Sequence, residues 1–465
     1  MNKKLERFKR GIKNKKVAVI GMGISNTPLI RYLTELGVDV TAFDKADKSK
    51  LEDVLYKLKG LDIKYSLGES YLSKLTGFDI IFKTPGMRYD VPELVRAREE
   101  GAEVTSEMEV FFDLCPAEII AVTGSDGKTT TTTIIYNILK TSGYNCWLGG
   151  NIGMPLLSSI DEIESSDKVV LELSSFQLHT MTASPHIAVI TNIAPNHLDM
   201  HKSMDEYVDA KKNIFKFQTD KDLLVLNHEN DISRKCASEA KGKVLFFSRL
   251  KEVDEGAFLR GNKVIFRKDG KETEIMDTHD ILLPGVHNHE NYLAATAAVM
   301  EYATPAPILE VASKFSGVEH RMELVREHKG IRYFNDSIGS SPTRTMAGLK
   351  SFDKKVILIA GGKDKNLDYT ELGELIVEKV KCLVLIGQTA TKIEQAVLQA
   401  VGNTGKGREM PVIKCETLHE AVHMAASKAE ESDIVILSPA SSSFDMFKNF
   451  EERGNIFKKV VNELQ

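Results

Sequence analysis

The sequence lacks most of the features that mark secreted proteins, membrane proteins or proteins stabilised by a bound metal. Its five cysteines are widely scattered, with no close pair that would suggest zinc or a redox motif, so we expect reduced thiols in a cytoplasmic protein. No apolar run approaches the roughly 20 residues needed to cross a bilayer, which predicts no membrane insertion. Fixed-period repeats and low-complexity tracts are also absent, which excludes repeat architectures.

A large excess of charge is lacking as well. With 42% hydrophobic residues, 27% charged residues and a net charge of −5, the chain resembles an ordinary globular protein and not an electrostatically driven nucleic-acid binder. We therefore expect small-molecule partners. The N-terminal arm is locally basic, with eight Lys or Arg and one Glu among its first sixteen residues. No apolar signal-peptide core follows it before residues 17–20, so we expect a solvated cap.

The length of 465 residues predicts three domains at roughly 150 residues each. Near-continuous β-branched runs end in glycine-rich turns and alternate with amphipathic helical stretches, which indicates parallel sheets covered by helices. We place the domains at residues 1–117, 118–318 and 319–465. Ligands bind such sheets at the carboxyl ends of the strands, where the unusual polar residues of this chain fall.

The stretch AVTGSDGKTTTTT, residues 121–133, is typical of a phosphate-binding loop between a strand and a helix. Gly124, Gly127, Lys128 and Thr129 keep the required spacing, although the first glycine of the common loop is missing. Lys128 can neutralise the β and γ phosphates of a nucleotide, and the Thr129 hydroxyl can bind Mg²⁺. The threonines that follow are poor interior helix formers, so we expect several to bond the backbone of the first turn.

Asp126 is unexpected in this loop. It places a carboxylate among backbone amides that should hold anions, and two like charges about 4 Å apart repel by roughly 4 kcal/mol at an effective dielectric near 20. We expect its charge to point away from the phosphates, to be paired with a cation, or to approach them only through Mg²⁺.

Other polar residues of the central segment have two readings each. Glu172 interrupts the buried run VVLEL and could be a Mg²⁺ ligand or part of a structural ion pair. His197, with Asp199 and His201, could suggest zinc, although no third ligand cluster is evident. Lys211 stands beside Lys212, where two solvated lysines on a helix are the ordinary interpretation. The amides in HNHEN, residues 287–291, could hold adenine or phosphate, or cap a helix.

The first segment contains an incomplete dinucleotide fingerprint. Gly21, Gly23 and Asn26 occupy its three glycine positions, and Asp44 follows about 20 residues on at the end of the next strand. A nicotinamide-dependent enzyme is weakly supported, and a uridine diphosphate conjugate at the helix N-terminus would fit as well. In the third segment, polar clusters follow strands or turns at EHR (319–321), NDS (335–337), GGKDK (361–365) and SPASSSFD (438–445).

Taken in order, these motifs resemble the Mur ligase family over the whole chain. The most specific are GSDGKTT, GGNIGMP, LELSSFQL, TNIAPNHLD followed by YVDAKKNIF, HNHEN, EHR, NDS and LSPASSSFDMFKNFEERG. The resemblance implies an α/β chain of three domains. These are an N-terminal Rossmann-like domain for a UDP-sugar, a central P-loop mononucleotide-binding parallel sheet for ATP, and a C-terminal Rossmann-like domain for an amino acid.

The resemblance also implies an activity. ATP would phosphorylate the carboxylate of UDP-N-acetylmuramoyl-L-alanine, the amine of D-glutamate would attack the acyl phosphate, and ADP and phosphate would leave, with Mg²⁺ as the cofactor. The closing run FDMFKNFEERG favours D-glutamate as the amino acid. We expect a cytoplasmic monomer in peptidoglycan precursor synthesis, with no nucleic-acid partner.

The site residues carried over from the family fall into four groups. The ATP group would be Gly124, Ser125, Asp126, Gly127, Lys128, Thr129, Thr130, Asn288, Asn291, Arg321 and Asp336. The metal group would be Thr129, Glu172, His197 and a carbamylated Lys211, and the catalytic group Lys128, His197 and Lys211. Ser25, Asn26, Asp44, Thr84 and Asn151 would line the UDP-substrate path, while Ser340, Lys365, Ser443 and Phe450 would surround D-glutamate.

Two departures from the family pattern stand out. A lysine that commonly follows Asp336 and Ser337 is replaced by Ile338, and Arg344 is close enough in sequence to substitute for its charge. Asp126 stands where the family more often has asparagine. The rival interpretations are a sister ligase for L-alanine or a diamino acid, a folylpolyglutamate synthetase, a nicotinamide-dependent dehydrogenase, and a nucleotide-gated binding protein without ligase activity.

Overall fold

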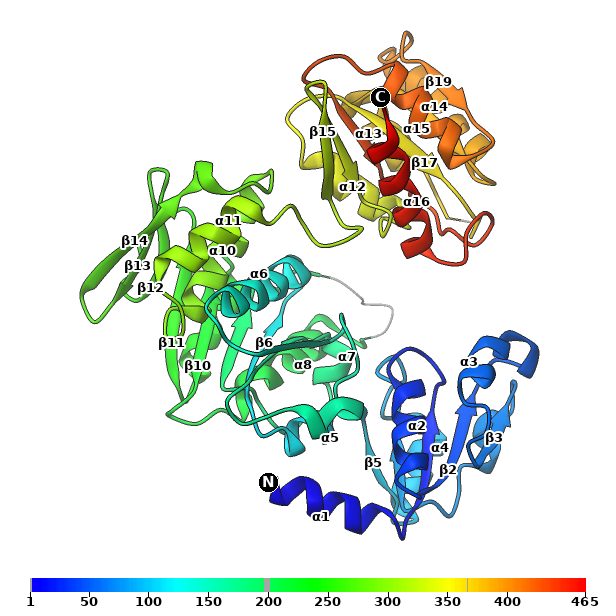
Figure 1. The fold of residues 1–465 in the computed structure, drawn as a ribbon, viewed down its shortest axis with the longest axis vertical. Helices are drawn as coiled ribbons and strands as arrows, with labels where there is room; N and C mark the ends of the chain where they lie inside the picture. Colours follow the sequence, from blue (N-terminus) through cyan, green and yellow to red (C-terminus); the bar gives the residue numbers. More distant parts are fainter. Residues whose placement is uncertain (1, 196–200, 366) are drawn as a thin grey trace. The chain divides into compact units, whose positions relative to one another are not determined.

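The computed structural model describes residues 2–195, 201–365 and 367–465, and these form three β-sheets with helices packed against them (Figure 1). Contacts divide the chain into two compact units. One comprises Met1–Asp280 with His287–Ser313, and the other Ile281–Val286 with Lys314–Gln465. The predicted α/β class with parallel sheets is confirmed, while the domain boundaries at 117 and 318 stay predictions.

The first sheet is wholly parallel, with strand order β3-β2-β1-β4-β5. Its strands are β1 (Lys16–Ile20), β2 (Asp39–Asp44), β3 (Ile63–Leu67), β4 (Ile80–Phe82) and β5 (Glu103–Thr105). The accompanying helices are α1 (Lys3–Ile12), α2 (Asn26–Glu35), α3 (Glu52–Lys57), α4 (Pro92–Glu99) and α5 (Glu107–Leu114). The chain leaves β1 toward β2 and later returns to pair β4 on the other side of β1, so the loops after β1 and β4 meet at a topological switch point.

The basic arm is not the solvated cap that we expected. Helix α1 buries Leu5 and Ile12, with Phe8 packed half-buried beside them, because these apolar residues recur on one face at helical spacing. Asn2 Nδ2 donates a hydrogen bond of 2.6 Å to the Leu114 carbonyl at the end of α5. The cations occupy the remaining faces, so the arm is an amphipathic helix attached to its domain.

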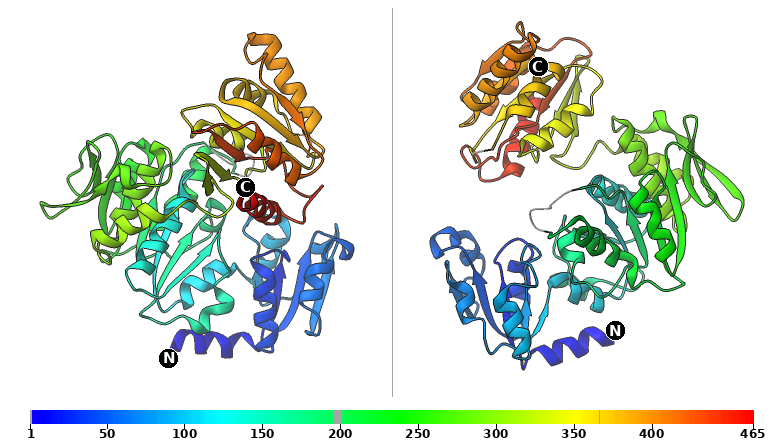
Figure 2. Two further views of the ribbon diagram at one scale, coloured as in Figure 1. Left: turned by 45° about the horizontal axis from the view of Figure 1, so that its top comes forward. Right: turned by 180° about the vertical axis from the view of Figure 1, so that it is seen from behind.

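The second sheet has nine strands in the order β14-β13-β12-β11-β10-β9-β6-β8-β7, parallel from β7 to β12. The strands are β6 (Glu118–Thr123), β7 (Cys146–Gly150), β8 (Lys168–Glu172), β9 (Ile187–Ile190), β10 (Leu223–Asn227), β11 (Lys243–Ser248), β12 (Gly256–Arg260), β13 (Lys263–Lys268) and β14 (Lys271–Asp277). The helices are α6 (Lys128–Thr141), α7 (Ser175–Leu178), α8 (Met204–Lys216), α9 (Asp231–Lys235), α10 (Val286–Val299) and α11 (Pro305–Lys314). Strands β13 and β14 pair antiparallel and extend from the sheet edge (Figure 2).

The third sheet has the order β15-β16-β20-β17-β18-β19 and is parallel except for the β15–β16 pair. Its strands are β15 (Glu323–His328), β16 (Ile331–Asn335), β17 (Val356–Gly361), β18 (Val380–Ile386), β19 (Val412–Lys414) and β20 (Ile434–Leu437). Its helices are α12 (Pro342–Lys350), α13 (Thr370–Lys379), α14 (Ala390–Thr404), α15 (Leu418–Ser427) and α16 (Phe450–Glu463). Leu358 and Ala360 pack under α12, α13 and α14, while Ile357 and Ile359 pack under α15 and α16, so helices cover both faces.

Within the described residues, no helix is long and apolar enough to cross a membrane.

Candidate active site

The loop between β6 and α6 has the backbone of a phosphate-binding loop. Gly124 and Gly127 have φ values of +151° and +76°. A Cβ atom at Gly124 would lie 1.9 Å from Thr191 Oγ1, and one at Gly127 would lie 2.5 Å from Asn291 Oδ1, so a side chain is excluded at both positions. Helix α6 begins directly at Lys128, and a helix N-terminus that follows such a loop is suited to bind an anion.

The polar side chains of this loop stabilise the loop itself. Lys128 Nζ donates to the Ser125 carbonyl at 2.9 Å, and Ser125 Oγ lies 2.9 Å from Tyr207 Oη on α8. Thr132 and Thr133 bond the carbonyls of the first turn of α6 at 2.8 Å each, as predicted for this threonine run. Thr130 is half-buried on the same turn.

The main chain of Asp126 is hydrogen-bonded to the segment after β9, while its side chain is exposed. Its carbonyl accepts hydrogen bonds from Thr191 Oγ1 at 2.6 Å and Asn192 Nδ2 at 3.3 Å, and its amide donates to Asn192 Oδ1 at 3.0 Å. The loop shape at this position therefore depends on the segment after β9, and the carboxylate lies in water, where charge repulsion is weakest.

Glu172 at the end of β8 is the buried carboxylate beside the loop, only 1% exposed. Its Oε2 accepts a hydrogen bond of 2.6 Å from Thr129 Oγ1, and its Oε1 accepts one of 2.7 Å from Asn151 Nδ2. Three residues predicted for the site thus meet across strands β6, β7 and β8, which are neighbours in the sheet. Carboxylate and hydroxyl oxygens are the ligands that Mg²⁺ prefers, so Thr129 and Glu172 fit this ion.

Lys211 is buried at 1% exposure, so the interpretation of two solvated lysines was wrong for it. Its Nζ donates to the Gly124 carbonyl at 2.8 Å, lies 3.3 Å from Thr123 Oγ1 and stands 4.7 Å from the ring centroid of Tyr207. Burial, with the nearby Lys128, lowers the pKa of Lys211 well below its usual range. Its neighbour Lys212 instead forms an ion pair of 2.6 Å with Glu239.

Asn288 and Asn291 on α10 are brought to the same loop. Asn291 Oδ1 accepts from Thr131 Oγ1 at 3.1 Å, and Asn291 Nδ2 donates to Asn288 Oδ1 at 2.9 Å. Both side chains are buried. The contact of Asn291 with α6 shows that this side chain does more than cap its own helix.

The zinc alternative rests partly on His197 and Asp199, which lie outside the described residues. His201 is buried, its Nε2 lies 2.9 Å from Ser175 Oγ, and its ring stacks on Phe176 with centroids 5.3 Å apart. In the part of the chain that the structure describes, no group of three or more His, Cys, Asp or Glu could hold a metal ion.

The predicted UDP-substrate residues of the first sheet gather at its switch point. Asp44 Oδ2 accepts from the Met22 amide at 2.7 Å, and Asn26 Nδ2 donates to the Ile20 carbonyl at 2.8 Å, so both side chains shape the loop after β1. A Cβ at Gly21 would lie 3.0 Å from Thr84 Cβ, which places the loop after β4 against it. Ser25 stands at the N-cap of α2.

In the second unit, Asp336 lies at the end of β16 and is buried. It accepts hydrogen bonds from Ser438 Oγ at 2.6 Å and from the Met322 amide at 3.3 Å. Burial raises the pKa of Asp336 to about 6, although the positive charge of Arg321 opposes the rise. The two predicted residues are thus electrostatic neighbours.

An arginine contacts the backbone at Ile338, the position where the family lysine is missing. Arg344 on α12 donates from Nη1 to the Ile338 carbonyl at 3.4 Å. The D-glutamate candidates lie on nearby loops of the same unit: Ser340 after β16, Lys365 after β17, and Ser443 after β20, with Phe450 at the start of α16. The backbone of Lys363 pairs with that of Ser442, which joins two of these loops.

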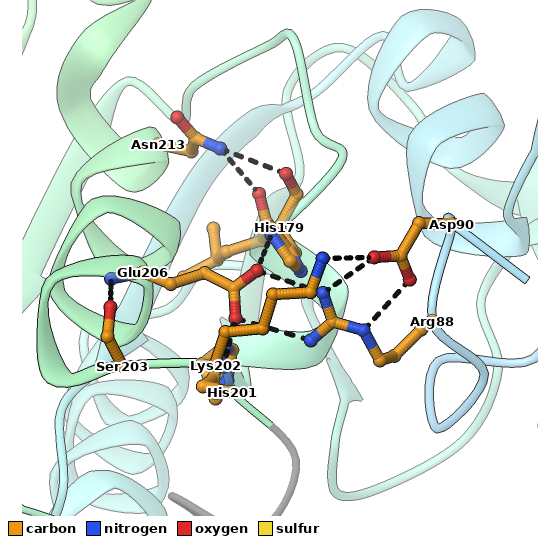
Figure 3. Close-up of polar contacts among 10 residues, drawn as sticks. Arg88, Asp90, His179, His201, Lys202, Ser203, Glu206 and Asn213 are labelled. Carbon is orange, nitrogen blue, oxygen red and sulfur yellow. Dashed lines mark hydrogen bonds and ion pairs between the residues drawn. The ribbon is translucent and has the colours of Figure 1, made fainter.

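Sequence reasoning missed a charged cluster in the first unit. Arg88 and Asp90, after β4, bond Lys202 and Glu206 at the start of α8 (Figure 3). His179 and His201 face the same carboxylate. These residues are far apart in the sequence, and no local motif identifies them.

The chain combines parallel sheets, a phosphate loop at the end of the interior strand β6, and a buried carboxylate beside that loop. These features define a class of α/β nucleotide-binding folds. Family models match the chain at residues 15–106 (Mur ligase MurD-like, N-terminal domain), 122–299 (Mur ligase middle domain) and 320–441 (Mur ligase, glutamate ligase domain). The chain belongs to the Mur ligase family.

Two curated relatives cover the chain from end to end. It is 64% identical to UDP-N-acetylmuramoylalanine–D-glutamate ligase of Acetivibrio thermocellus and 58% identical to the enzyme of that name from Ruminiclostridium cellulolyticum, each over 100% of both chains. The predicted family resemblance is thereby confirmed.

Solved structures support the fold. UDP-N-acetylmuramate-alanine ligase MurC from Thermotoga maritima matches with a TM-score of 0.59 at 21% identity, covering 97% of this chain and 99% of that one. A pseudomurein peptide ligase type C from Methanothermus fervidus matches with a TM-score of 0.53 at 19% identity, covering 97% and 100%. At these identities the similarity concerns the fold alone.

Proposed function

We propose that this chain is an ATP-dependent ligase that joins D-glutamate to UDP-N-acetylmuramoyl-L-alanine in peptidoglycan precursor synthesis. The carboxylate of the L-alanyl group attacks the γ-phosphorus of ATP, forming an acyl phosphate and releasing ADP. The amine of D-glutamate then attacks the acyl carbon, and phosphate leaves as the amide bond forms. The full-length identity to relatives named for this reaction supports the choice of substrates.

The single observation that carries the proposal is the meeting of Thr129, Glu172 and Asn151 beside the phosphate loop. In this site the loop amides and Lys128 bind the phosphates of ATP. Thr129 and Glu172 would hold Mg²⁺, which would supply neutralisation of the phosphate charge. Asn151 orients the Glu172 carboxylate and would also bind the UDP-substrate. Catalysis then depends on positioning and electrostatic stabilisation by these residues.

Lys211 is suited to carbamylation because its amine is buried and its pKa is lowered. A neutral amine attacks carbon dioxide, a nitrogen–carbon bond forms, and one proton is released to solvent. The product is an anion where a cation would stand. A carbamate at this position would supply a further oxygen ligand beside the loop, with His197 as the partner that the family pattern assigns.

The remaining ligand assignments follow the placement of the residues in each unit. Asn291 contacts the phosphate-loop helix and bonds Asn288, and both would bind ATP, as would Arg321 and Asp336 of the second unit. The switch-point residues Ser25, Asn26, Asp44 and Thr84 would bind the UDP-substrate. Ser340, Lys365, Ser443 and Phe450 would bind D-glutamate, with Arg344 supplying the cation absent at Ile338. We propose a cytoplasmic enzyme that acts as a monomer.

The experiment that tests this function measures phosphate release with UDP-N-acetylmuramoyl-L-alanine and ATP while the amino acid is varied. Release that requires D-glutamate supports the proposal. Release that requires L-alanine or a diamino acid would assign a sister reaction, and ATP binding with no release would indicate a binding protein without ligase activity.

A further inference from the structure

An ion-pair cluster, formed by Arg88, Asp90, Lys202 and Glu206, connects the loop after β4 to the start of α8 (Figure 3). The Arg88 guanidinium forms a fork on Glu206, with Nη2 donating to Oε1 at 2.9 Å and Nη1 to Oε2 at 3.2 Å. Its Nε donates to Asp90 Oδ1 at 2.9 Å, and Lys202 Nζ donates to Asp90 Oδ2 at 2.7 Å. Both carboxylates are therefore bound to Arg88.

This cluster is better shielded than an ordinary surface ion pair. The side chains of Arg88 and Glu206 are only 24% and 19% exposed. The hydrogen bonds from Arg88 hold the pKa of Glu206 down at about 2, so the carboxylate is ionised at neutral pH. His179 and His201 approach Glu206 at 3.7 Å, but burial lowers the pKa of each ring and so disfavours its charged form. Arg88 is therefore the cation that donates side-chain hydrogen bonds to this carboxylate.

Glu206 also fixes the N-terminus of α8. Ser203 caps the helix by accepting a hydrogen bond from the Glu206 amide at 3.1 Å, and the Glu206 carboxylate accepts one of 2.5 Å from the Lys202 amide. Arg88 therefore binds the side chain that stabilises the first turn of the helix. A shift of the loop after β4 would be transmitted directly to this turn.

The next residues of α8 reach the phosphate loop. Tyr207 Oη lies 2.9 Å from Ser125 Oγ, and Lys211 Nζ lies 2.8 Å from the Gly124 carbonyl. At its other end, the loop after β4 contains Thr84, which lies against Gly21 at the switch point of the first sheet. A continuous set of contacts thus runs from the switch point through Arg88, Glu206 and α8 to the loop between β6 and α6.

We propose that Arg88 and Glu206 are positioning residues that couple occupancy of the UDP-substrate site to the geometry of the phosphate loop and Lys211. The proposal rests on the function proposed above, because that function assigns the UDP-substrate to one end of this set of contacts and ATP to the other. Binding of the UDP-substrate orders the loop after β4, the Arg88 fork orders the first turn of α8, and Tyr207 and Lys211 are then held for ATP. Coupling between sites of this kind typically changes affinity by about 5- to 150-fold.

The test uses the full-length chain and the variants Arg88→Met, Arg88→Lys, Glu206→Gln and the Arg88→Met/Glu206→Gln double variant. For each, titration calorimetry gives the affinity for a non-hydrolysable ATP analogue with and without saturating UDP-N-acetylmuramoyl-L-alanine. In the wild type we expect the UDP-substrate to tighten analogue binding at least about fivefold. Arg88→Met and Glu206→Gln should each abolish most of this effect. The double variant should lose no more coupling than either single variant, because the two changes remove the same interaction.

Kinetics separates positioning from simple stabilisation. We expect Arg88→Met to lower kcat about tenfold while the KM for D-glutamate changes less than about twofold, since only the geometry at the phosphate loop is altered. Arg88→Lys keeps the charge without the fork and should recover part of both kcat and coupling, which also provides a folded variant if Arg88→Met is unstable.

The matched control is Arg260→Met. Arg260 at the end of β12 also makes a two-point contact with a glutamate, because its Nε and Nη2 donate to Glu252 at 2.7 and 2.8 Å in an exposed cluster of the β13–β14 region. The Arg260→Met variant should leave kcat and the coupling between the two ligands unchanged. The proposal is overturned if the Arg88 and Glu206 variants melt at lower temperature yet keep wild-type kcat and coupling, or if their losses add in the double variant. Failure of the wild type to release phosphate with D-glutamate would instead contradict the proposed function.

Discussion

Lys211 Nζ lies 2.8 Å from the carbonyl oxygen of Gly124, so the phosphate loop and helix α8 are joined by a buried amine. The side chain is 1% exposed, and burial lowers its pKa well below the usual range. A lysine in this environment is poised to be neutral, the form that attacks electrophiles. The reactive state of this one side chain thus depends on the packing of α8 against the loop.

Replacement of Lys211 by arginine tests this environment. The guanidinium stays protonated and cannot carry a carbamate, so we expect kcat to fall at least about 100-fold. Depleting dissolved carbon dioxide should lower wild-type activity, and added bicarbonate should restore it, whereas Lys211→Arg should respond to neither. Wild-type activity that is independent of bicarbonate, together with an active arginine variant, would contradict carbamylation.

Glu172→Gln should separate metal binding from folding. The amide can still bond Thr129 and Asn151 but carries no charge, so we expect the Mg²⁺ concentration for half-maximal activity to rise at least about tenfold. Glu118→Gln, at the other end of the strand β6 that precedes the loop, is the control and should leave that concentration unchanged. Melting curves check that both variants are folded. An unaltered Mg²⁺ requirement in Glu172→Gln would remove this residue from the metal site.

The raised pKa of Asp336 predicts that the stability of the protein depends on pH. Its pKa is raised to about 6 in the folded state from an ordinary value of 3.8, so the folded protein holds the proton more tightly than the unfolded chain. The stability that this provides is present below pH 4 and is lost as pH rises toward 6, by about 3 kcal/mol in total. Denaturant unfolding of wild type and Asp336→Asn between pH 4 and 8 should show this slope in the difference between them. A difference that is constant with pH would exclude it.

Arg344→Ala should raise the apparent KM for D-glutamate, because the variant removes the guanidinium that reaches the Ile338 carbonyl. We expect an increase of about tenfold, as for the loss of one charge-assisted contact. Lys350→Ala removes an exposed cation at the far end of the same helix and serves as the control. An unchanged KM in Arg344→Ala would show that the missing lysine has no substitute at this position.

Asp126→Asn should change the affinity for ATP by less than about threefold. The Asp126 carboxylate is exposed, and its main chain is held by Thr191 and Asn192 in a way that the side chain does not affect. Binding measured at low and at 0.15 M salt tests this, because screening weakens any repulsion between exposed charges. If the variant binds ATP tenfold or more tightly, the native loop does not shield this charge.

The local motifs of the site could be predicted from sequence because their chemistry is contained in a few consecutive residues. Gly124, Gly127, Lys128 and Thr129 specify a turn and a helix start, and the structure places them as such. The sequence marks Glu172 as unusual because a carboxylate interrupts a buried strand, but its pairing with Thr129 and Asn151 depends on the strand order of the sheet.

Features that arise from long-range packing could not be predicted. The burial of Lys211 requires α8 to pack on the loop after β6, and the pairing of Arg88 with Glu206 joins residues 118 positions apart. Short strands such as β5 and β19, with three residues each, carry too little pattern to be recognised alone. They form because a neighbouring strand is already in place.

The most direct test of the account follows an oxygen atom. The L-alanyl carboxylate of UDP-N-acetylmuramoyl-L-alanine is labelled with ¹⁸O and incubated with ATP and either D- or L-glutamate, and the released phosphate is analysed by mass spectrometry. An acyl phosphate predicts that phosphate released with D-glutamate carries one ¹⁸O atom, and that L-glutamate yields little phosphate. Unlabelled phosphate, or equal release with both enantiomers, would contradict the proposed reaction.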